Sequence, residues 1–273
     1  MRNASAHVQG IPTMTKDLSP EERKSMILKR VNESGRVLAN AVATEFGVSE
    51  DSIRRDLREL SEAGLVQRFH GGAARSSSSF RSFQQRAKDE TAGKKAVAAV
   101  AAERIAPNAT MLLDSSTTVL EFVRALPVNL QMRIITSSPD IASAALDHPL
   151  CEVILLGGTL NRFTRSVIGQ SPLAEVQLMH VDYCVLGACA IDESLTLRAE
   201  NYEDAHLKLA MSKASNEVML LATAEKLLKQ APFAIAPISA ISTLITDRTA
   251  DPSIVERIRS VGVEVVIADR RGA

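Results

Sequence analysis

The chain has 273 residues, with 32 basic and 32 acidic residues, and 45% of it is hydrophobic. This composition is typical of a folded protein with room for two modest domains, and it excludes disorder throughout. No apolar run is long enough to span a bilayer, and residues 1–19 lack the apolar core of a secretory signal. We therefore expect a flexible polar tail, a cytoplasmic protein and no membrane partner.

Residues 20–75 are predicted to form a small helical domain that ends in a hairpin. Ser19 can cap a first helix, Pro20 suits its first turn, and Gly35 ends it. A second helix is expected over residues 39–46, where Leu38 cannot act as a cap and Asn40 is the cap candidate.

A third helix is expected after the turn residue Gly47, with Ser49 as its cap and Gly64 as its stop. Its apolar face consists of Ile53, Leu57 and Leu60. Two short strands around His70-Gly71-Gly72 then predict a β-hairpin. This order of elements is typical of a winged helix-turn-helix, although a charged amphipathic helix in another small domain would show the same periodicity.

Basic residues gather in one part of this neutral chain. Between Ser52 and Lys88 there are eight basic and three acidic residues, a net of +5, which suits contact with phosphates. Recognition helices meet base edges with their N-terminal residues, and arginine reads guanine through two donors. Asp56 is expected to pair with a nearby arginine or to hold the helix in its domain. The candidate DNA-binding residues are Ser49, Glu50, Asp51, Ser52, Arg54, Arg55, Arg58, Arg68 and His70.

Residues 76–91, which begin with a serine run, are interpreted as a linker. From residue 92 to residue 273 helical patterns alternate with short β-rich runs, which predicts a mostly parallel α/β domain. Strands are expected over residues 110–113, 133–136, 151–156, 183–186, 217–221, 242–245 and 263–267, and helices over residues 94–105, 117–125 and 140–145.

The run from Val48 to Ala73 resembles the signature of DeoR-family regulators: VSEDSIRRDLRELSEAGLVQRFHGGA. The usual threonine is Ser52 here, whose hydroxyl can serve equally. The resemblance implies a winged helix-turn-helix followed by a sugar-phosphate sensor, similar in fold to ribose-phosphate isomerases, that also carries the oligomer contacts. The sensor motifs follow in the family order: KKAVAAVAAERI, LLDSSTT, TSS, LLGGTL, VIGQ, LGACAID, EDAHLK and LITD.

The residues themselves also favour an anion pocket. The run Asp114 to Thr118 stands where a strand ends and a helix begins, and helix N-termini with hydroxyls bind phosphate well. Glycines at strand ends would let a ligand approach the backbone, and lysines would supply charge, although surface lysines and simple turns fit such residues too. The candidate effector-binding residues are Lys94, Asp114, Ser115, Ser116, Thr117, Thr118, Ser137, Ser138, Gly157, Gly158, Gly187, Cys189, Asp204, Lys208 and Lys226.

The chain departs from the family pattern at several of these positions. The usual Gly-Ala-Asp-Gly-Ile loop is Gly-Ala-Cys-Ala-Ile over residues 187–191, and the usual glutamate before Lys208 is Asp204. The usual aspartate at Thr223, glycine at Ser116 and asparagine at Ser137 are likewise replaced. Cys189 cannot readily replace an acid at neutral pH, so we expect no catalytic residues, and a pocket that keeps its phosphate end and alters its sugar end.

Three cysteines, Cys151, Cys184 and Cys189, match neither a zinc site nor a redox pair, so we expect reduced thiols, no metal and no cofactor. We expect a transcriptional regulator, most commonly a repressor in such families, whose partners are double-stranded operator DNA, a small phosphorylated metabolite and further copies of itself in a dimer or tetramer. Two alternatives stay open: a sugar-phosphate isomerase or deaminase with an added helical domain, and a winged helix that binds protein.

Overall fold

The structure is a computed structural model that describes residues 18–34, 36–62, 65–69, 71–75, 82–89 and 92–269. The chain divides into two compact units, Met1–Phe80 and Arg81–Ala273, and each is described by itself. Of the polar tail expected over residues 1–19, residues 1–17 lie outside the described residues, as do the expected stop at Gly64 and the candidate reader His70.

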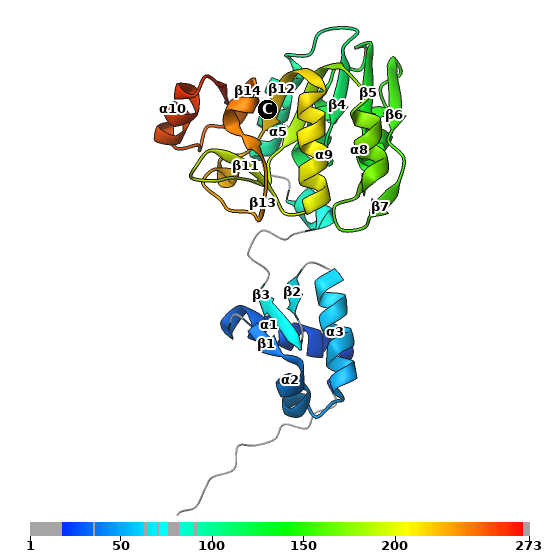
Figure 1. The fold of residues 1–273 in the computed structure, drawn as a ribbon, viewed down its shortest axis with the longest axis vertical. Coiled ribbons are helices and arrows are strands. Elements are labelled where there is room, and N and C mark those ends of the chain that lie inside the picture. Colours follow the sequence, from blue (N-terminus) through cyan, green and yellow to red (C-terminus); the bar gives the residue numbers. More distant parts are fainter. Residues whose placement is uncertain are drawn as a thin grey trace, which may run out of the picture. The chain divides into compact units, whose positions relative to one another are not determined.

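The first unit is a winged helix-turn-helix, as the sequence predicts (Figure 1). Its three strands pair antiparallel in the order β1-β3-β2, and three helices pack beside them. Its elements are α1 (Pro20–Ser34), β1 (Arg36–Leu38), α2 (Ala39–Phe46), α3 (Glu50–Glu62), β2 (Val66–Phe69) and β3 (Gly72–Arg75).

The start of α2 differs from the expectation that Asn40 caps it. The helix begins at Ala39 with Leu38 in the extended capping position and no side-chain cap. Instead, the Ala39 amide donates to the carbonyl of Gly71 at 2.9 Å, in the turn of the hairpin. Asn40 lies inside the first turn, where its carboxamide oxygen accepts from the Ala41 amide at 2.8 Å. The hairpin thus accepts the first amide of the helix, which has no partner within the helix.

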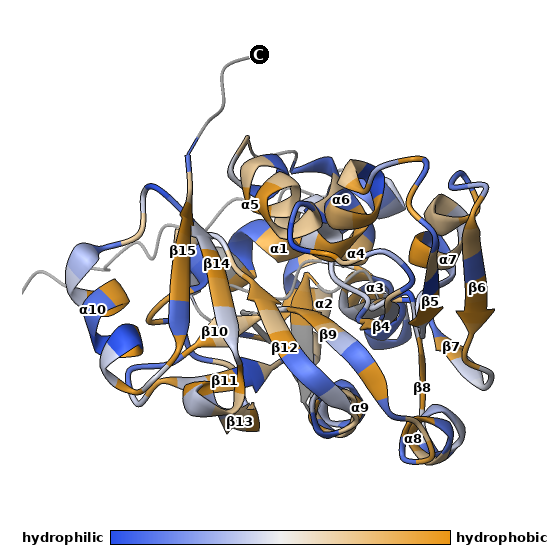
Figure 2. Ribbon diagram, turned by 90° about the horizontal axis from the view of Figure 1, so that it is seen from above, coloured by the Kyte–Doolittle hydropathy of each residue, from blue (hydrophilic) through white to orange (hydrophobic). Residues whose placement is uncertain are grey.

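The second unit is built on a seven-stranded parallel sheet in the order β15-β14-β12-β9-β4-β5-β6. Helices cover both faces, with α5 and α6 on one side and α8 and α9 on the other (Figure 2). Its strands are β4 (Thr110–Leu113), β5 (Met132–Thr136), β6 (Cys151–Leu155), β9 (Val181–Gly187), β12 (Ser215–Leu221), β14 (Thr243–Asp247) and β15 (Glu264–Ala268). Its helices are α4 (Phe83–Lys88), α5 (Ala92–Ala102), α6 (Thr117–Ala125), α7 (Pro139–Ala145), α8 (Gln170–Val176), α9 (Tyr202–Lys213) and α10 (Pro252–Ser260).

Alternate residues of each central strand enter two separate cores. On β4, Met111 and Leu113 pack with α5 and α6, whereas Leu112 packs with the core that contains α9 and α10. This period of two is what a sheet covered on both faces requires. Two small antiparallel sheets complete the unit: β7 (Thr159–Asn161) with β8 (Ser166–Ile168), and β10 (Ala190–Ile191), β11 (Thr196–Ala199) and β13 (Phe233–Pro237).

The predicted linker over residues 76–91 is too long. Residues 83–88 form helix α4, which belongs to the second unit, and Phe83 is buried in the core beside α5 and α6. The helix has a capping box: Ser82 accepts from the Gln85 amide, and the Gln85 side chain accepts from the Ser82 amide. This local signature in the sequence Ser-Phe-Gln-Gln is the signal that would have revealed the helix.

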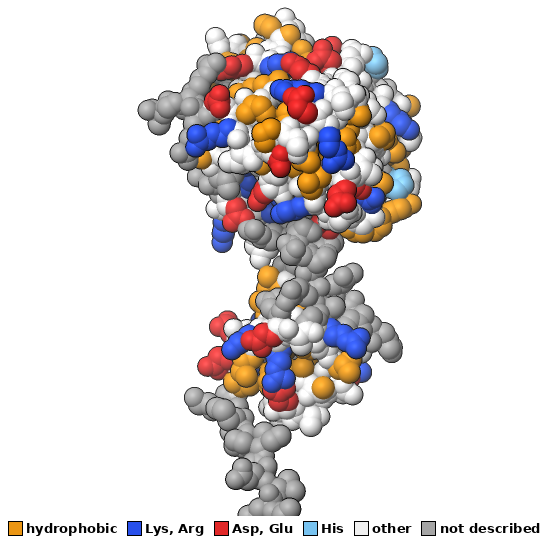
Figure 3. Space-filling model, turned by 90° about the vertical axis from the view of Figure 1, so that its left-hand side faces the viewer, with side chains coloured by type: hydrophobic (Ala, Val, Ile, Leu, Met, Phe, Trp, Pro, Cys, Tyr) orange, Lys and Arg blue, Asp and Glu red, His pale blue; other side chains and the backbone are white. Residues whose placement is uncertain are grey.

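The surface carries charges of both signs. On the face drawn in Figure 3, basic and acidic side chains are interspersed on both units, in keeping with the zero net charge of the chain. Within the described residues, none of the helices is long and apolar enough to cross a membrane.

Candidate functional site

Helix α3 presents an apolar face to its own domain and a charged face to solvent. Ile53, Leu57 and Leu60 are buried in the core of the first unit. The opposite face carries Arg54, Arg55 and other charged side chains, all exposed. Because the charged residues follow the helical period, they form one continuous face that a DNA groove could receive. That face consists of Asp51, Arg54, Arg55 and Arg58.

The first turn of α3 is held by the two serines at its start. Ser49 acts as the cap, since its hydroxyl accepts from the Ser52 amide at 3.1 Å, and the two hydroxyls lie 2.8 Å apart. Arg54 donates to Glu50 at 2.8 Å and lies 3.8 Å from Asp51. These ion pairs are exposed and weak, so DNA phosphates or bases can compete for the arginine.

Asp56 holds α3 in its domain, which is one of the two roles expected for it. Its carboxylate is buried and accepts two hydrogen bonds from the Arg23 guanidinium on α1. The Asp56 hydrogen bond also raises the pKa of Arg23 above its ordinary value, against the effect of burial. Arg23 is therefore a structural partner that the sequence reasoning missed, because its contact spans two helices.

The basic stretch from Ser52 to Lys88 is not one surface. Arg86 and Lys88 lie on α4 in the second unit, so they cannot be counted with the arginines of α3. The Arg68 side chain, like His70, lies outside the described residues. Among the described side chains, the candidate DNA-binding arginines are therefore Arg54, Arg55 and Arg58, all on α3.

A second candidate site lies where the strand order of the large sheet reverses. From β4 the strands continue through β5 to β6, and from β9 they continue through β12 and β14 to β15. Ligands of open parallel sheets bind at such a reversal, outside the carboxyl ends of the strands. Asp114 follows β4, and its carboxylate accepts from the amide of Gly187, the last residue of β9, at 2.8 Å. A side chain thus ties together the two strand ends that flank the reversal.

A buried cluster of charges surrounds Asp114. Lys208 on α9 forms an ion pair with Asp114, donates to the Gly187 carbonyl at 3.3 Å and lies 3.8 Å from Asp204. Burial opposes the charge on Lys208, but the two carboxylates outweigh burial and raise its pKa above the ordinary value. Burial raises the pKa of Asp204 and of the Cys189 thiol. We call Asp114, Gly187, Cys189, Asp204 and Lys208 the switch-point cluster.

The space in front of Gly187 is filled by the chain itself. A side chain added there would collide with the Oγ and Cβ atoms of Ser116. Ser116 in turn caps α6, because its hydroxyl accepts from the Val119 amide at 3.0 Å, and its own amide donates to Asp114 at 2.8 Å. A glycine at this position therefore allows the two loops to pack closely.

The other expected hydroxyls lie along the same edge of the sheet. Ser115, Thr117 and Thr118 follow β4 and are largely buried. After β5, Ser137 accepts from the Val167 amide at 2.7 Å through its carbonyl, and the Ser138 hydroxyl is buried without a hydrogen-bond partner in the described part of the chain.

The glycines after β6 lie near β8 and α8. Gly158 has a φ of 140°, and a side chain there would come within 2.9 Å of Val167. At Gly157 the nearest atom to an added side chain is the Glu175 carboxylate, 3.8 Å away. Gly157 is therefore the less crowded of the two positions.

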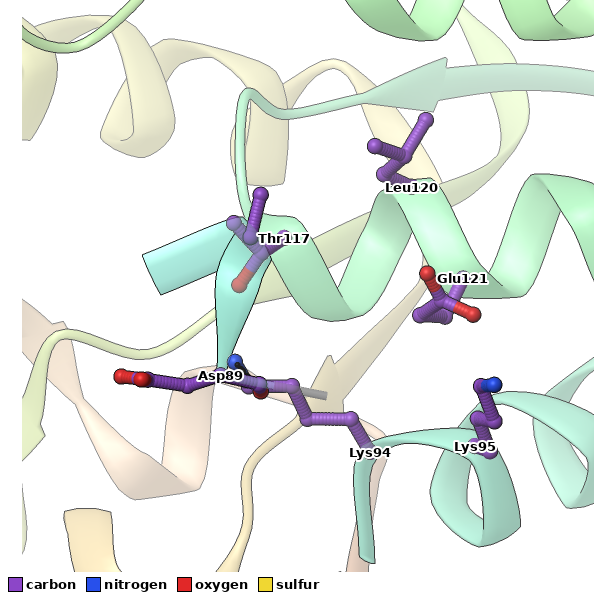
Figure 4. Close-up of a pocket in the computed structure, with 7 residues that line it drawn as sticks. Asp89, Lys94, Lys95, Thr117, Leu120 and Glu121 are labelled. Atoms are coloured by element: carbon purple, nitrogen blue, oxygen red, sulfur yellow. Dashed lines mark hydrogen bonds between the residues drawn. The ribbon is translucent and has the colours of Figure 1, made fainter. Parts of the chain in front are cut away.

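Lys94 lies in a different environment from Lys208. Its ammonium donates to the carbonyls of Arg86 and Asp89, at the end of α4, at 2.7 and 2.9 Å. It lines a small pocket between α4, α5 and α6. Figure 4 shows Lys94 on one side of this pocket and Thr117, at the start of α6, on the other. Burial lowers the pKa of Lys94, and the charge of nearby Lys226 lowers it further.

The sequence reasoning did not assign Arg86 to this site. It lies on α4, its Nε atom is buried, and the described residues offer that atom no hydrogen-bond partner. Its charge acts on Asp204 and Cys189, opposing the rise in pKa that burial causes. Because residues 76–91 were interpreted as a linker, no buried arginine was expected there.

The chemistry of the switch-point cluster is that of a closed ion-pair network. The three cysteines are free thiols, and the described residues contain no group of three or more histidine, cysteine or acidic side chains arranged to hold a metal ion. Lys208 is committed to carboxylates, and the Cys189 thiol is kept protonated by its burial. The charges of the cluster are therefore satisfied largely by one another.

Comparison with protein families matches most of the chain. Residues 23–79 match the model of the DeoR-like helix-turn-helix domain, and residues 89–248 match the model of the DeoR C terminal sensor domain. The second match alone includes more than half of the chain and contains every residue of the switch-point cluster.

Curated relatives match along almost their full length. The chain is 34% identical over 249 residues to the HTH-type transcriptional regulator GlpR of Haloferax volcanii, covering 90% of this chain and 97% of that one. It is 31% identical over 252 residues to the HTH-type transcriptional repressor CsqR of Escherichia coli, covering 92% and 97%. It is 30% identical over 236 residues to the glycerol-3-phosphate regulon repressor of Escherichia coli, covering 86% and 94%.

Among solved structures, ribose 5-phosphate isomerase A from Neisseria gonorrhoeae is similar to part of the chain. The TM-score is 0.38 at 14% identity, and the match covers 50% of this chain and 53% of that one. A likeness this weak carries no inference about function.

Proposed function

The chain belongs to the DeoR family of helix-turn-helix transcriptional regulators, and on that premise we propose that it binds double-stranded operator DNA through α3 and releases or engages it in response to a phosphorylated metabolite. The observation that carries the DNA part is the exposed charged face of α3, with Arg54 and Arg55 near its start. Repression is the expected outcome, because two of the relatives described above are named repressors.

The effector is proposed to bind at the carboxyl edge of the large sheet. The start of α6, with Thr117 and Thr118, supplies helix amides and hydroxyls of the kind that bind phosphate. Lys94 and Lys226 lie near this edge and add positive charge. The glycerol-3-phosphate repressor named above supports a small phosphorylated polyol or sugar as the effector class.

The sugar end of the pocket is proposed to differ from that of the relatives. Cys189 replaces the family aspartate, and its protonated thiol is a poor acceptor for sugar hydroxyls. The same replacement argues against turnover, since an isomerase needs a carboxylate to move protons between carbons. We therefore propose a regulator without catalytic activity.

The protein is proposed to act as a homo-oligomer, because helix-turn-helix proteins meet two half-sites one helical turn apart. The edge strand β6 favours a contact through the second unit. Among the described residues it pairs only with β5, and Ile154 and Leu155 are exposed. Strand β6 also lacks the lysine or proline that commonly prevents free strand edges from pairing. The nearby Arg133–Glu152 ion pair carries both signs of charge, so the β6 edges of two copies would not repel each other.

Selection of bound fragments from sheared genomic DNA tests the DNA part. The purified protein should enrich a small set of fragments, and an inverted repeat within them should bind with nanomolar affinity at physiological salt.

A thermal-shift screen of glycerol 3-phosphate, ribose 5-phosphate and hexose phosphates tests the effector part. Enrichment no better than random, or turnover of ribose 5-phosphate, would overturn the proposal.

A further inference from the structure

Helix α4 connects the linker region to the core of the second unit. Phe83 anchors its start in the core, and the Phe83 amide donates to the Phe163 carbonyl at 3.0 Å. Lys94 fixes its end, by donating to the carbonyls of Arg86 and Asp89. Both ends of this short helix are therefore attached to the unit that contains the proposed effector site.

Arg86 projects a charge from this helix toward the switch-point cluster. The Arg86 charge acts on Asp204, Cys189 and Lys94, so its guanidinium lies in the neighbourhood of all three. Its Nε atom is buried and has no hydrogen-bond partner among the described residues. A buried donor without an acceptor is destabilising and is rare in folded proteins, so it points to a group that binds there.

The other cations of this region are engaged by the protein itself. Lys208 donates to Asp114 and to the Gly187 carbonyl, and Lys94 donates to two carbonyls of α4. An arginine fork matches the oxygens of a phosphate or carboxylate, and a hydrogen bond between opposite charges is among the strongest in proteins. The missing acceptor is therefore best supplied by an anionic ligand.

We propose that Arg86 binds the anionic group of the effector and that α4 thereby transmits occupancy of the sensor to the DNA-binding unit. This inference rests on the proposed function. Residues 76–81, which join the two units, immediately precede Ser82, the cap of α4. An effector bound to Arg86 contacts the first helix after that junction. Its binding free energy can therefore favour one placement of the DNA-binding unit over another.

The test compares Arg86→Gln and Arg86→Lys with Lys88→Gln, an exposed position on the same helix. Each full-length variant is titrated with glycerol 3-phosphate, ribose 5-phosphate and inorganic phosphate, and its operator affinity is measured with and without each anion. We expect Arg86→Gln to bind operator like the wild type without anion, but to bind the anion about tenfold to a hundredfold more weakly and to lose the operator response. Arg86→Lys should fall between, and Lys88→Gln should match the wild type.

A purely structural role for Arg86 would give a different result. Arg86→Gln would then lower the unfolding temperature without ligand, whereas our proposal expects it to stay the same or rise, because an unsatisfied buried donor is removed. An unchanged anion response in Arg86→Gln overturns this inference alone. If the wild type responds to none of the three anions, both this inference and the effector part of the proposed function are overturned. The DNA part is tested separately, by the selection of operator DNA.

Discussion

Asp114 and Lys208 form a buried ion pair that joins the end of β4 to the middle of α9. The Asp114 carboxylate also accepts from Gly187, so one side chain links β4, β9 and α9 at the reversal of the strand order. The carboxyl edge of the sheet is therefore held in place by contacts within the protein. Because Asp114 is used in these contacts, we expect its neighbours, rather than Asp114 itself, to contact the ligand.

Replacing Lys208 by methionine should strongly destabilise the second unit. Asp114 and Asp204 would remain buried without their cation, and breaking a buried ion pair from one side costs about 3–5 kcal/mol. Urea unfolding followed by circular dichroism measures the change. Lys213→Met, at an exposed position on the same helix, is the control and should change the free energy of unfolding by less than about 0.5 kcal/mol. Equal losses in the two variants would contradict the role given to Lys208.

Gly187→Ala should destabilise the protein through a collision with Ser116. The added methyl group would overlap the Ser116 side chain, and overpacking of this kind costs about 1–3 kcal/mol. Ser116→Gly alone should cost only about a few tenths of a kcal/mol, because glycine is tolerated at a helix cap. The double variant should recover much of the loss in a double-mutant cycle, whereas strictly additive losses would argue against the contact.

Local patterns in the sequence predicted the three helices of the first unit and the seven strands of the large sheet, but not α4, α8, α9, α10 or the strands of the two small sheets in the second unit. The residue ranges of α2, α6 and β4 were predicted correctly, although the cap expected for α2 was not. Those of β5, β6 and β14 were correct within a residue or two, as apolar runs allow. Strand β1 was missed, since three residues give no periodicity and its pairing with β3 is a tertiary contact.

The candidate site was only partly predictable. Motif order placed Asp114, Gly187 and Lys208 at one edge of the sheet, but it could not reveal that they bond to one another. The role of Gly187 depends on Ser116, which comes from a loop about seventy residues earlier in the chain. Arg86 was missed because a run of serines nearby suggested a linker, and a single charged residue carries no sign of its burial.

Arg54→Ala and Arg55→Ala should each weaken operator binding, by about 1–3 kcal/mol where the contact is to a base. Both side chains lie on the exposed face of α3, and the exposed pairs of Arg54 with Glu50 and Asp51 hold it only weakly. Fluorescence anisotropy on the selected operator measures the affinity at several salt concentrations. Lys29→Ala, an exposed charge on α1, is the control. The assignment of α3 fails if both arginine variants bind as tightly as this control.

The ionised carboxylate of Asp192 should make the free energy of unfolding depend on pH. The Ser194 hydroxyl, the Thr196 amide and the Arg198 guanidinium all bond to its carboxylate and hold its pKa below the ordinary value. The ionised carboxylate therefore contributes stability that is fully present above the unfolded pKa of about 4 and is lost as the pH falls through the lower folded value.

Asp192→Asn tests this dependence. The variant should be less stable than the wild type at neutral pH, and the difference should shrink as the pH falls below about 4, because the wild-type group also becomes neutral. Urea midpoints at a series of pH values measure the difference, with the exposed neighbour Glu193→Gln as the control for loss of one charge. A difference that is constant with pH would mean that the carboxylate is not held by these bonds.

Ile154→Lys should reduce the size of the assembly. The side chain is exposed on the edge strand β6, and a charge on a sheet edge opposes pairing with a second copy. Light scattering coupled to size-exclusion chromatography measures the mass, and Leu178→Lys is the control because Leu178 is 90% exposed and lies outside every strand. We expect a smaller species for Ile154→Lys and the wild-type mass for the control. A monomeric wild type, or dissociation in the control alone, would show that copies of the chain do not meet along β6. Because each copy contributes one α3, the Ile154→Lys protein should also lose operator affinity while its unfolding temperature stays near that of the control.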